Sequence, residues 1–411
     1  MGFARVVAPV TAKQTTGQNA RAMNIGPVTL SSQHSSETWR LDQAARAFSL
    51  GRMRDKAVSL LQELTEAHSV PGHEDEVRAI FVDELAECGE LATDRNGSVF
   101  CESGGDGPRV ILAGHMDEVG FLVQNITPDG FVQFVAVGGW WEHNLLSQRV
   151  EILTRGGEKI LGVIASRPPH FLPENQRRQV MHVDQLFIDV GAENRRQAIE
   201  ELGISLGDPI APCSAFTPMA REDYFMAKAF DNRVGMAGVI QSGQILTQSM
   251  HPNRLILCGT VQEEVGLRGA KTAANFAKPD VAIVLEGPPA DDAPGFSRAD
   301  CQGRLGGGVQ IRMFDPTAIA NPRLARLAID TARAEGIPHQ VTVRRSGGTD
   351  AGSFHLANDG IPCIVLGVPA RYIHSHNAII DLNDYLHMLS LVIALIRQLD
   401  GETVDDLLAY L

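Results

Sequence analysis

Residues 255–286, with the sequence LILCGTVQEEVGLRGAKTAANFAKPDVAIVLE, carry the pattern that decides the fold. The apolar run at 255–261 has the composition of a buried strand, and the stretch from Leu267 to Phe276 has apolar residues at helical spacing. A second apolar run, at 280–286, follows this helix. A strand, a helix and another strand in this order are typical of α/β proteins, whose parallel strands are covered by the helices that connect them.

The same alternation continues on both sides of this stretch. Residues 109–113 (RVILA) and 361–367 (IPCIVLG) are apolar runs of strand length, and residues 382–399 have the pattern of a long amphipathic helix. We therefore predict an α/β layered domain with a mostly parallel central sheet, formed by residues 51–117 and 215–411.

The region from 118 to 214 has a different pattern. Its apolar segments are short and strand-like, turn sequences such as Pro128-Asp129-Gly130 separate them, and only residues 193–202 have helical spacing. Many short strands at regular spacing are typical of a small barrel or sandwich. Because this region interrupts the α/β pattern, we predict that it is an inserted β-barrel domain.

The composition excludes several classes of function. The chain has 36 Lys and Arg against 49 Asp and Glu, a net charge of −13, whereas nucleic-acid binding needs a basic surface. Its apolar runs are shorter than the ~18 residues that a membrane span requires. The six cysteines form no CxxC pair and are too sparse for a disulfide scaffold, so we expect free thiols and a cytoplasmic protein.

Residues 1–50 precede the first clear pattern, and we expect them to be a disordered N-terminal extension. The first 36 residues contain no Asp or Glu and eight Ser or Thr, which is also the composition of a transit peptide. They lack the amphipathic pattern of such peptides, and Met23 or Met53 is an alternative start. The sequence does not decide between a targeting segment and a start placed too early.

Imidazole and carboxylate side chains gather where the predicted strands end. The residues concerned are His115, Asp117, Asp231, Glu263, Glu264, Glu286 and His374. Each has an ordinary alternative: Asp231, at a strand-to-helix junction, has the chemistry of a helix N-cap, and Glu263 with Glu264 would suit a solvated acidic loop. In open α/β sheets, however, ligands bind at the carboxyl ends of the strands. The shared placement of these residues therefore favours a metal site.

The order of the sequence motifs resembles the M42 family of dinuclear metallo-aminopeptidases. The motifs are GHMDEVGF (114–121), AFDNR (229–233), QEEVGLRGA (262–270), the acid at 286, GGTDAG (347–352) and RYIHSH (371–376). The resemblance covers about residues 53–400. This family includes glutamyl and deblocking aminopeptidases that form tetrahedral dodecamers. The resemblance implies a zinc-exopeptidase-like core, an inserted barrel that serves assembly, peptide substrates and a homo-oligomer such as a dodecamer.

The resemblance also implies a ligand set for two divalent metal ions. His115, Asp231 and Glu286 would hold one ion. Asp231, Glu264 and His374 would hold the other, with Asp231 as the bridge. Imidazole and carboxylate ligands suit Zn²⁺, Co²⁺ or Mn²⁺, and the sequence does not choose among them. Two ions ~4 Å apart can acidify the water between them, which is the expected nucleophile.

Two further residues are assigned to catalysis and three to substrate binding. By the resemblance, Glu263 would be the general base, which takes the proton of the attacking water and returns it to the departing amine. Asp117 would orient His115 by contact with its ring. In the glycine-rich loop, the residues expected to bind substrate are Gly348, Thr349 and Asp350.

Two positions depart from the family's pattern. The acid at 286 is often Asp in this family, and the additional methylene of Glu286 changes the reach of the carboxylate. The last motif continues with His376 rather than with small residues and a Glu, so His376 is an alternative to His374 as the last ligand. We keep His374 because it aligns with the family's motif. The other histidines are expected to be surface or core residues.

Two other classes of function stay open. A carbohydrate hydrolase, a label that members of this family have sometimes received, also needs two carboxylates about 5–9 Å apart but no metal. A non-catalytic oligomeric scaffold would lack a ligand or the base, and none is missing here. The apolar stretch that ends in Trp140 and Trp141 is either an oligomer interface or part of the barrel core. The sequence does not reveal the preferred N-terminal residue of the substrate.

Overall fold

The computed structural model describes residues 51–410. The extension predicted at 1–50 therefore lies outside the described residues. Within the described chain, no helix is both long and apolar enough to cross a membrane.

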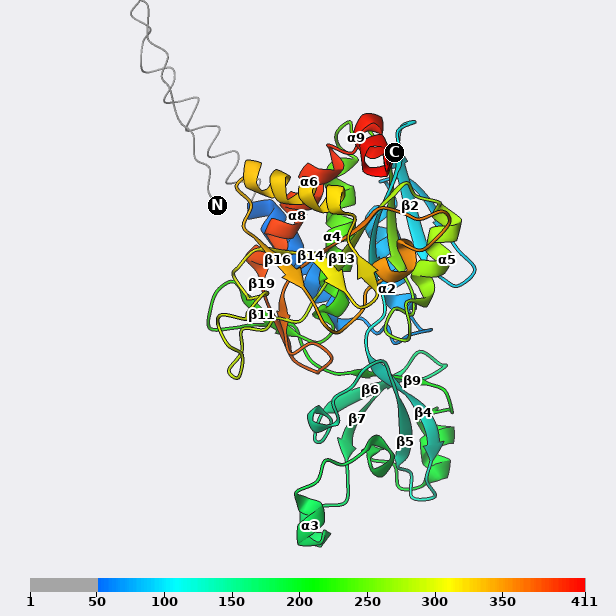
Figure 1. Ribbon diagram of the computed structural model, residues 1–411. Coiled ribbons are helices and arrows are strands. Elements are labelled where there is room, and N and C mark those ends of the chain that lie inside the picture. The colour runs from blue at the N-terminus through cyan, green and yellow to red at the C-terminus, as the bar shows by residue number, and fades with distance from the viewer. Residues whose placement is uncertain (1–50, 411) are drawn as a thin grey trace, which may run out of the picture. The chain divides into compact units, whose positions relative to one another are not determined.

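A nine-stranded sheet forms the centre of the α/β domain (Figure 1). Its strands are β1 (Glu90–Thr93), β2 (Val99–Gly104), β3 (Arg109–His115), β12 (Arg254–Thr260), β13 (Val281–Glu286), β14 (Val309–Asp315), β15 (Ala318–Ile319), β16 (His339–Val343) and β17 (Cys363–Gly367). The order across the sheet is β1-β2-β12-β3-β13-β17-β14-β15, and β16 also pairs with β14. The middle strands β12, β3, β13 and β17 are parallel, which confirms the predicted parallel core, and antiparallel pairs complete both flanks.

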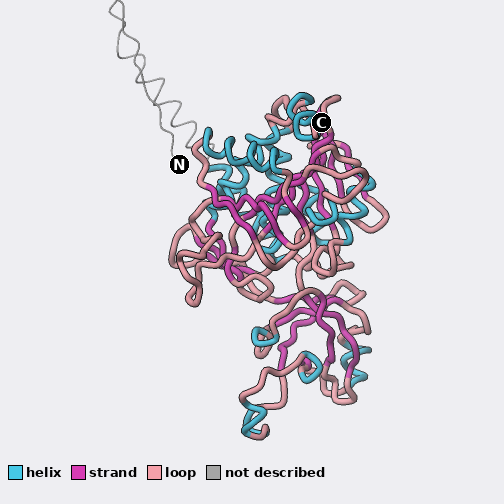
Figure 2. The backbone as a smooth tube through the Cα atoms, in the orientation of Figure 1, coloured by secondary structure: helices cyan, strands magenta, loops and turns pink. Residues whose placement is uncertain are grey.

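Helices cover both faces of this sheet (Figure 2). They are residues 51–66, α2 (Asp75–Leu85), α4 (Phe230–Leu246), α5 (Arg268–Ala277), α6 (Pro322–Ala334), α7 (Ala351–Phe354), α8 (Leu382–Ile396) and α9 (Gly401–Leu408). Helix α4 packs on β3, β12 and β13 and on its neighbours α2 and α8, whereas α5 packs on α7. The predicted α/β layered architecture is therefore confirmed.

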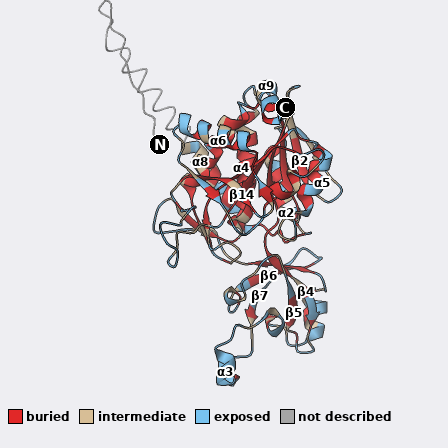
Figure 3. Cartoon of the chain, viewed as in Figure 1, coloured by how far each residue is buried: buried red, intermediate tan, exposed pale blue. Residues whose placement is uncertain are grey.

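The side chains of β3 alternate between two hydrophobic cores. Val110 and Leu112 belong to the core with α2, α4, α6 and α8, whereas Ile111 and Ala113 belong to the core with α5 and α7. Because helices cover both faces, the strand is apolar at successive positions, which is why its sequence is a continuous apolar run. Figure 3 shows the strands of the sheet as the buried centre of this domain.

The segment that follows β3 forms the predicted small β-barrel. Its strands are β4 (Gly120–Ile126), β5 (Val132–Val137), β6 (Arg149–Leu153), β7 (Lys159–Ala165), β8 (Phe187–Asp189) and β9 (Pro209–Pro212). They close in the order β4-β5-β8-β7-β6-β9 around apolar side chains such as Phe121, Phe134 and Ile188. The connection between β7 and β8 carries the short helix α3 (Glu174–Arg177). The helix predicted at 193–202 is shorter, and most of it is a π-helical turn at Gln197–Glu201.

The two neighbouring tryptophans of the barrel have different surroundings. Trp140 is half-buried: its Nε1–H donates to the carbonyl oxygen of Gly120 at 3.0 Å, and its ring stacks on Phe121 with 4.7 Å between centroids. Trp141 is 63% exposed. Trp140 is therefore part of the barrel packing, and Trp141 is the member of the pair that lies at the surface.

A small four-stranded sheet brings two distant segments together. Its strands are β10 (Thr217–Pro218), β11 (Tyr224–Ala227), β18 (Ala370–Arg371) and β19 (Ala378–Asp381), in the order β10-β11-β19-β18. Strand β11 leads into α4, and the connection between β18 and β19 carries His374. Because β11 pairs with β19, the start of α4 and this connection lie side by side.

Candidate active site

The predicted ligand residues meet at the carboxyl edge of the parallel strands. His115 is the last residue of β3, and Glu286 is the last residue of β13. Glu263 and Glu264 follow shortly after the end of β12, and Asp231 lies in the first turn of α4. Because β3 lies between β12 and β13, the ends of these strands are neighbours. The parallel sheet thus places side chains from four distant segments at one point.

Asp231 is at the centre of this cluster. Its Oδ1 lies 3.2 Å from Nε2 of His115, and its Oδ2 lies 3.5 Å from Nε2 of His374. Oε2 of Glu286 lies 3.6 Å from Nε2 of His115. Oε2 of Glu264 lies 3.3 Å from Nε2 of His374. Two groups, each with one imidazole and two carboxylates, therefore share Asp231, and the ligand atoms of each group lie within 4.8 Å of one another.

Hydrogen bonds to backbone carbonyls fix the orientation of both imidazole rings. Nδ1–H of His115 donates to the carbonyl oxygen of Asp117 at 3.0 Å, and Nδ1–H of His374 donates to that of Gly139 at 2.7 Å. In the neutral ring, a proton on Nδ1 leaves the lone pair of Nε2 available to bind a cation. Metal-binding histidines are commonly held in this way.

Two carboxylate oxygens of the cluster have no hydrogen-bond partner in the described chain, and a bound cation would take the place of one. Oε1 of Glu264 and Oε1 of Glu286 are buried with no hydrogen-bond partner in the described chain. The side chains of Asp231, Glu263, Glu264 and Glu286 are at most 14% exposed. Adjacent carboxylates repel one another unless cations or protons lie between them. The donor set, imidazole nitrogen with carboxylate oxygen, therefore fits divalent ions such as Zn²⁺, Co²⁺ or Mn²⁺.

Burial and crowded charges shift the pKa values in the cluster. Burial raises the pKa of Glu263 well above its usual value; the imidazole of His115 opposes this shift, and the neighbouring carboxylates add to it. Burial also raises the pKa values of Glu264 and Glu286. Burial disfavours the charged form of His374, but hydrogen bonds to two carboxylates outweigh it and raise the pKa to about 11. In the absence of cations, protons therefore partly balance the charge of the cluster.

Asp117 holds several parts of the site in place. Its Oδ1 accepts a hydrogen bond from the backbone N–H of Glu263 at 2.9 Å, and its Oδ2 accepts one from that of Glu264 at 3.0 Å. Oδ1 also lies 3.5 Å from Nδ1 of His115. Asp117 thus lies next to His115. It also fixes the loop that carries both glutamates, and the sequence did not indicate this second contact.

His376 lies away from the ligand cluster. Its side chain is 2% exposed, and it belongs to none of the metal-type groups in the described chain. Burial lowers the pKa of its imidazole to about 4. His374, by contrast, faces two carboxylates, so the geometry favours His374 over His376 as a ligand.

A cavity of about 560 Å³ opens beside the cluster, and all five predicted metal ligands and Glu263 line it. Of the loop residues predicted to bind substrate, Gly348 and Thr349 also line this cavity. Asp350 does not: it is fully buried, and the hydroxyl of Thr260 donates to its Oδ2. Asp350 therefore does not line the cavity, and its contact with substrate stays a prediction.

Three residues of this region were not singled out from the sequence. Arg312 and Arg344 line the cavity. Oε1 of Glu74 accepts hydrogen bonds from the backbone N–H groups of Gly72 at 2.7 Å and Gln262 at 3.2 Å, and so supports the loop before the two glutamates. A charged residue inside the apolar strand β14 was a signal that could have identified Arg312. Nothing in the local sequence marks the other two.

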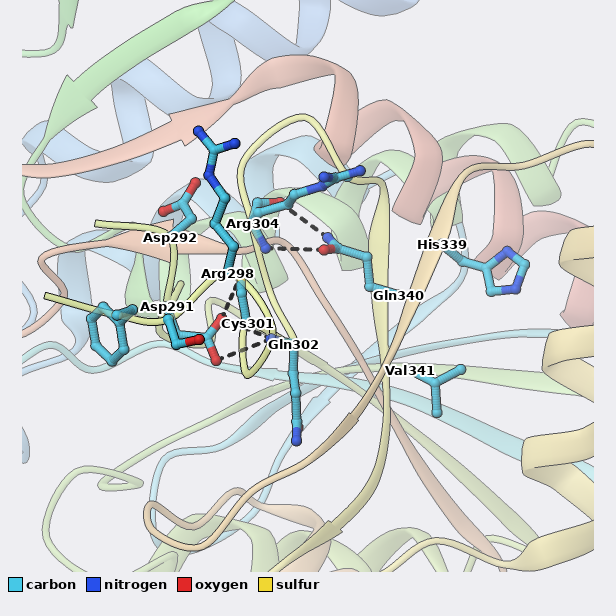
Figure 4. Close-up of a pocket in the computed structure, with 12 residues that line it drawn as sticks. Asp291, Asp292, Arg298, Cys301, Gln302, Arg304, His339, Gln340 and Val341 are labelled. Carbon is cyan, nitrogen blue, oxygen red and sulfur yellow. Dashed lines mark hydrogen bonds between the residues drawn. The ribbon is translucent and has the colours of Figure 1, made fainter. Parts of the chain in front are cut away.

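A second cavity, of about 670 Å³, lies between the loop at 291–307 and β16 (Figure 4). In this loop, Oδ1 of Asp291 accepts hydrogen bonds from the backbone N–H groups of Gln302 and Gly303. None of the described residues that line this cavity belongs to the ligand cluster. The two cavities are therefore distinct sites.

Comparison with known proteins shows the family of the chain. The model of the family described as M42 glutamyl aminopeptidase matches residues 97–391. The glutamyl aminopeptidase of Lactococcus lactis subsp. cremoris (strain MG1363) is 36% identical over 355 residues, which are 85% of this chain and 98% of that protein. These matches include both the barrel and the strands that carry the ligand cluster.

Solved structures are similar over the same part of the chain. The TET aminopeptidase from the marine sediment archaeon Thaumarchaeota archaeon SCGC AB-539-E09 is 40% identical, with a TM-score of 0.83 over 86% of this chain and 99% of that chain. The TET1 peptidase of Pyrococcus horikoshii, described as able to assemble into a tetrahedron or a large octahedral shell, is 30% identical, with a TM-score of 0.75 over 84% of this chain and 100% of that chain. The fold, the site and these matches agree, and the chain belongs to the M42 glutamyl aminopeptidase family and is a peptidase hydrolase.

Proposed function

We propose that this chain is a dinuclear metal-dependent aminopeptidase that removes N-terminal residues from peptides. The observation that carries the proposal is the position of Asp231, whose two carboxylate oxygens face the Nε2 atoms of two different imidazoles. His115, Asp231 and Glu286 would hold one ion. Asp231, Glu264 and His374 would hold the second, and Zn²⁺, Co²⁺ and Mn²⁺ all suit these donors.

Glu263 is the general base in this proposal. When bound, two divalent ions would polarise the scissile carbonyl and make water acidic enough to lose a proton near neutral pH. Glu263 lines the cavity, lies outside both ligand groups that share Asp231, and has its Oε2 3.9 Å from Nε2 of His115. Its carboxylate would accept a proton from the attacking water. It would then pass this proton to the peptide nitrogen as the C–N bond breaks. The hydrogen bond from its backbone to Asp117 holds it in place.

Digestion of an unstructured peptide is expected to produce a ladder that shortens from the N-terminus. Each product should lack one more N-terminal residue and keep the original C-terminus, and the rest should appear as free amino acids. Mass spectrometry of the digest by metal-loaded protein measures this directly. The same peptide with a C-terminal amide is the matched control and should be digested equally well. Products that keep the original N-terminus would contradict an aminopeptidase.

We also propose that the barrel at 118–214 mediates assembly into a homo-oligomer, such as a dodecamer built from dimers. The similar TET1 peptidase of Pyrococcus horikoshii assembles into closed shells, as its description states. On the barrel of this chain, Leu161, Trp141 and Phe171 are 47%, 63% and 67% exposed. Large exposed apolar side chains are typical of protein interfaces, and tryptophan is enriched among their anchors.

Replacing Trp141 by glutamate is expected to shift the protein to smaller soluble species, because a charge would then lie in the interface. Light scattering during size-exclusion chromatography measures the mass. Trp141→Phe is the matched control and should keep the full assembly. Trp140→Glu should instead lower the unfolding temperature, because Trp140 packs on Phe121 inside the barrel. Full-size assembly of folded Trp141→Glu protein would refute the role of Trp141, and a strictly monomeric active enzyme would refute the assembly itself.

A cytoplasmic location is part of the same proposal. All six cysteines lie in the described part of the chain and are free thiols. Free thiols are typical of proteins in a reducing compartment.

A further inference from the structure

We propose that the second cavity, between the loop at 291–307 and β16, binds a small organic anion, and that Arg298 and Arg304 bind its carboxylate or phosphate group (Figure 4). The volume of about 670 Å³ lies within the range of small-molecule sites, about 300–1,000 Å³. In the described chain, this cavity shares no lining residue with the cavity beside the ligand cluster. The inference therefore goes beyond the proposed function and does not rest on it.

Two aspartates fix the loop that forms one wall of the cavity. Oδ1 of Asp291 accepts hydrogen bonds from the backbone N–H groups of Gln302 at 3.1 Å and Gly303 at 2.8 Å. Oδ2 of Asp292 accepts one from that of Leu305 at 3.1 Å. These bonds join the start of the loop to its end. The wall is therefore formed before a ligand binds, which lowers the entropy cost of binding.

The side chain of Gln340 holds the same loop against β16. Its Oε1 accepts a hydrogen bond from the backbone N–H of Arg304 at 3.0 Å, and its Nε2 donates to the carbonyl oxygens of Arg304 and Gly308, each at 3.0 Å. A Cβ atom added to Gly307 would lie 2.4 Å from Cδ of Gln340, so this close approach needs glycine. The backbone of Arg304 is thus fixed beside β16, and its side chain lines the cavity.

Arginines from outside the cavity balance the charge of its two carboxylates. Nη1 of Arg344 donates to Oδ2 of Asp291 at 2.7 Å. Arg371 binds Asp292 with two hydrogen bonds, from Nε to Oδ1 at 2.7 Å and from Nη2 to Oδ2 at 2.6 Å. Neither Arg344 nor Arg371 lines this cavity. Asp291 and Asp292 are therefore already paired and would not repel a bound anion strongly.

The guanidinium groups of Arg298 and Arg304, by contrast, have no counter-ion. Both residues are exposed and line the cavity, and neither guanidinium has a hydrogen-bond or ion-pair partner in the described chain. The other titratable nitrogen base of the wall is His339, whose Nδ1–H donates to the carbonyl oxygen of Ile337 at 2.9 Å. The unbalanced charge of the wall is therefore positive. The planar fork of donors on a guanidinium fits carboxylates and phosphates.

Two apolar side chains favour an organic anion over an inorganic one. Phe296 and Val341 line the same cavity and are 60% and 45% exposed. Small-molecule sites combine apolar walls with a few polar groups that fix the orientation of the ligand. A ligand with an apolar body and one anionic group would use both kinds of contact.

Titration of the metal-loaded protein with phenylacetate and with phenylacetamide, followed by saturation-transfer NMR, tests the inference. The two probes have nearly the same shape and differ in charge. Charge-assisted hydrogen bonds predict a Kd about 10-fold lower for phenylacetate. Phenyl phosphate separates the two ligand classes: a Kd below that of phenylacetate would assign the site to phosphates, and a higher one would assign it to carboxylates. Equal or tighter binding of phenylacetamide, or no binding of either anion, would overturn the inference.

Variants are needed to assign the binding to this cavity, because bound metal ions also attract carboxylates. The double variant Arg298→Gln/Arg304→Gln should raise the Kd of phenylacetate about 10-fold and leave the hydrolysis of aminoacyl p-nitroanilides unchanged. Arg326→Gln is the matched control, because Arg326 is an exposed arginine of α6 that does not line the cavity. Thermal unfolding shows whether the variants are folded. An unchanged Kd in the folded double variant would place the probe elsewhere and overturn the inference.

Discussion

Replacing Glu263 by glutamine is expected to remove nearly all turnover and to leave metal binding intact. An amide has the size of a carboxylate but does not accept a proton at neutral pH, so the variant loses the general base and keeps the shape of the cavity. Loss of a general base lowers kcat by about 10²–10⁴-fold. The measurement is kcat with an aminoacyl p-nitroanilide, together with elemental analysis of the bound metal in the same sample.

Glu264→Gln is the matched control for this variant, because it makes the same chemical change at the next residue. Oε2 of Glu264 lies 3.3 Å from Nε2 of His374, and its other carboxylate oxygen has no partner in the described chain. This variant should lose metal and regain activity when metal is added in excess. Both glutamates lie within reach of His115, so distance alone does not separate their roles. If Glu263→Gln lost metal and Glu264→Gln kept it, the two roles would be exchanged.

Removing the metal is expected to abolish hydrolysis completely, and adding Zn²⁺, Co²⁺ or Mn²⁺ is expected to restore it. The reason is that the ions would acidify the attacking water and polarise the carbonyl. Without cations, burial also raises the pKa values of Glu263 and Glu286, which favours the protonated form that does not accept a proton. Peptidase assays before and after dialysis against a chelator measure the loss. Circular dichroism of the metal-free protein should show that it is still folded. A metal-independent carbohydrate hydrolase would stay active under the same treatment.

The strand-end residues of the site could be predicted from the sequence for a physical reason. Parallel strands covered on both faces are continuous apolar runs, so their ends are visible in the sequence, and the first polar residues after them lie at one edge of the sheet. His115 and Glu286 are such residues. These two residues could be placed without knowing any contact between distant segments of the chain.

Other parts of the site depend on contacts between distant segments, which local sequence patterns do not contain. His374 reaches the cluster because β19 pairs with β11. From the sequence alone, His376 was an alternative to His374 as the last metal ligand. Arg344 faces the cavity because its loop is held by an ion pair to Asp291. Trp140 and Trp141 are adjacent in sequence, yet one packs in the barrel and the other is exposed. Each of these outcomes is decided by packing between segments far apart in the chain.

Titration of the metal-free protein with Zn²⁺ or Co²⁺, with peptidase activity measured at each addition, tests the two-ion site most directly. Because two groups of ligands share Asp231, activity should rise to a plateau at about two ions per chain. The Asp231→Asn variant, which would weaken both ligand groups, should need a large excess of metal or stay inactive. Full activity in metal-free protein, or a plateau at one ion per chain with no second ion bound, would contradict the account.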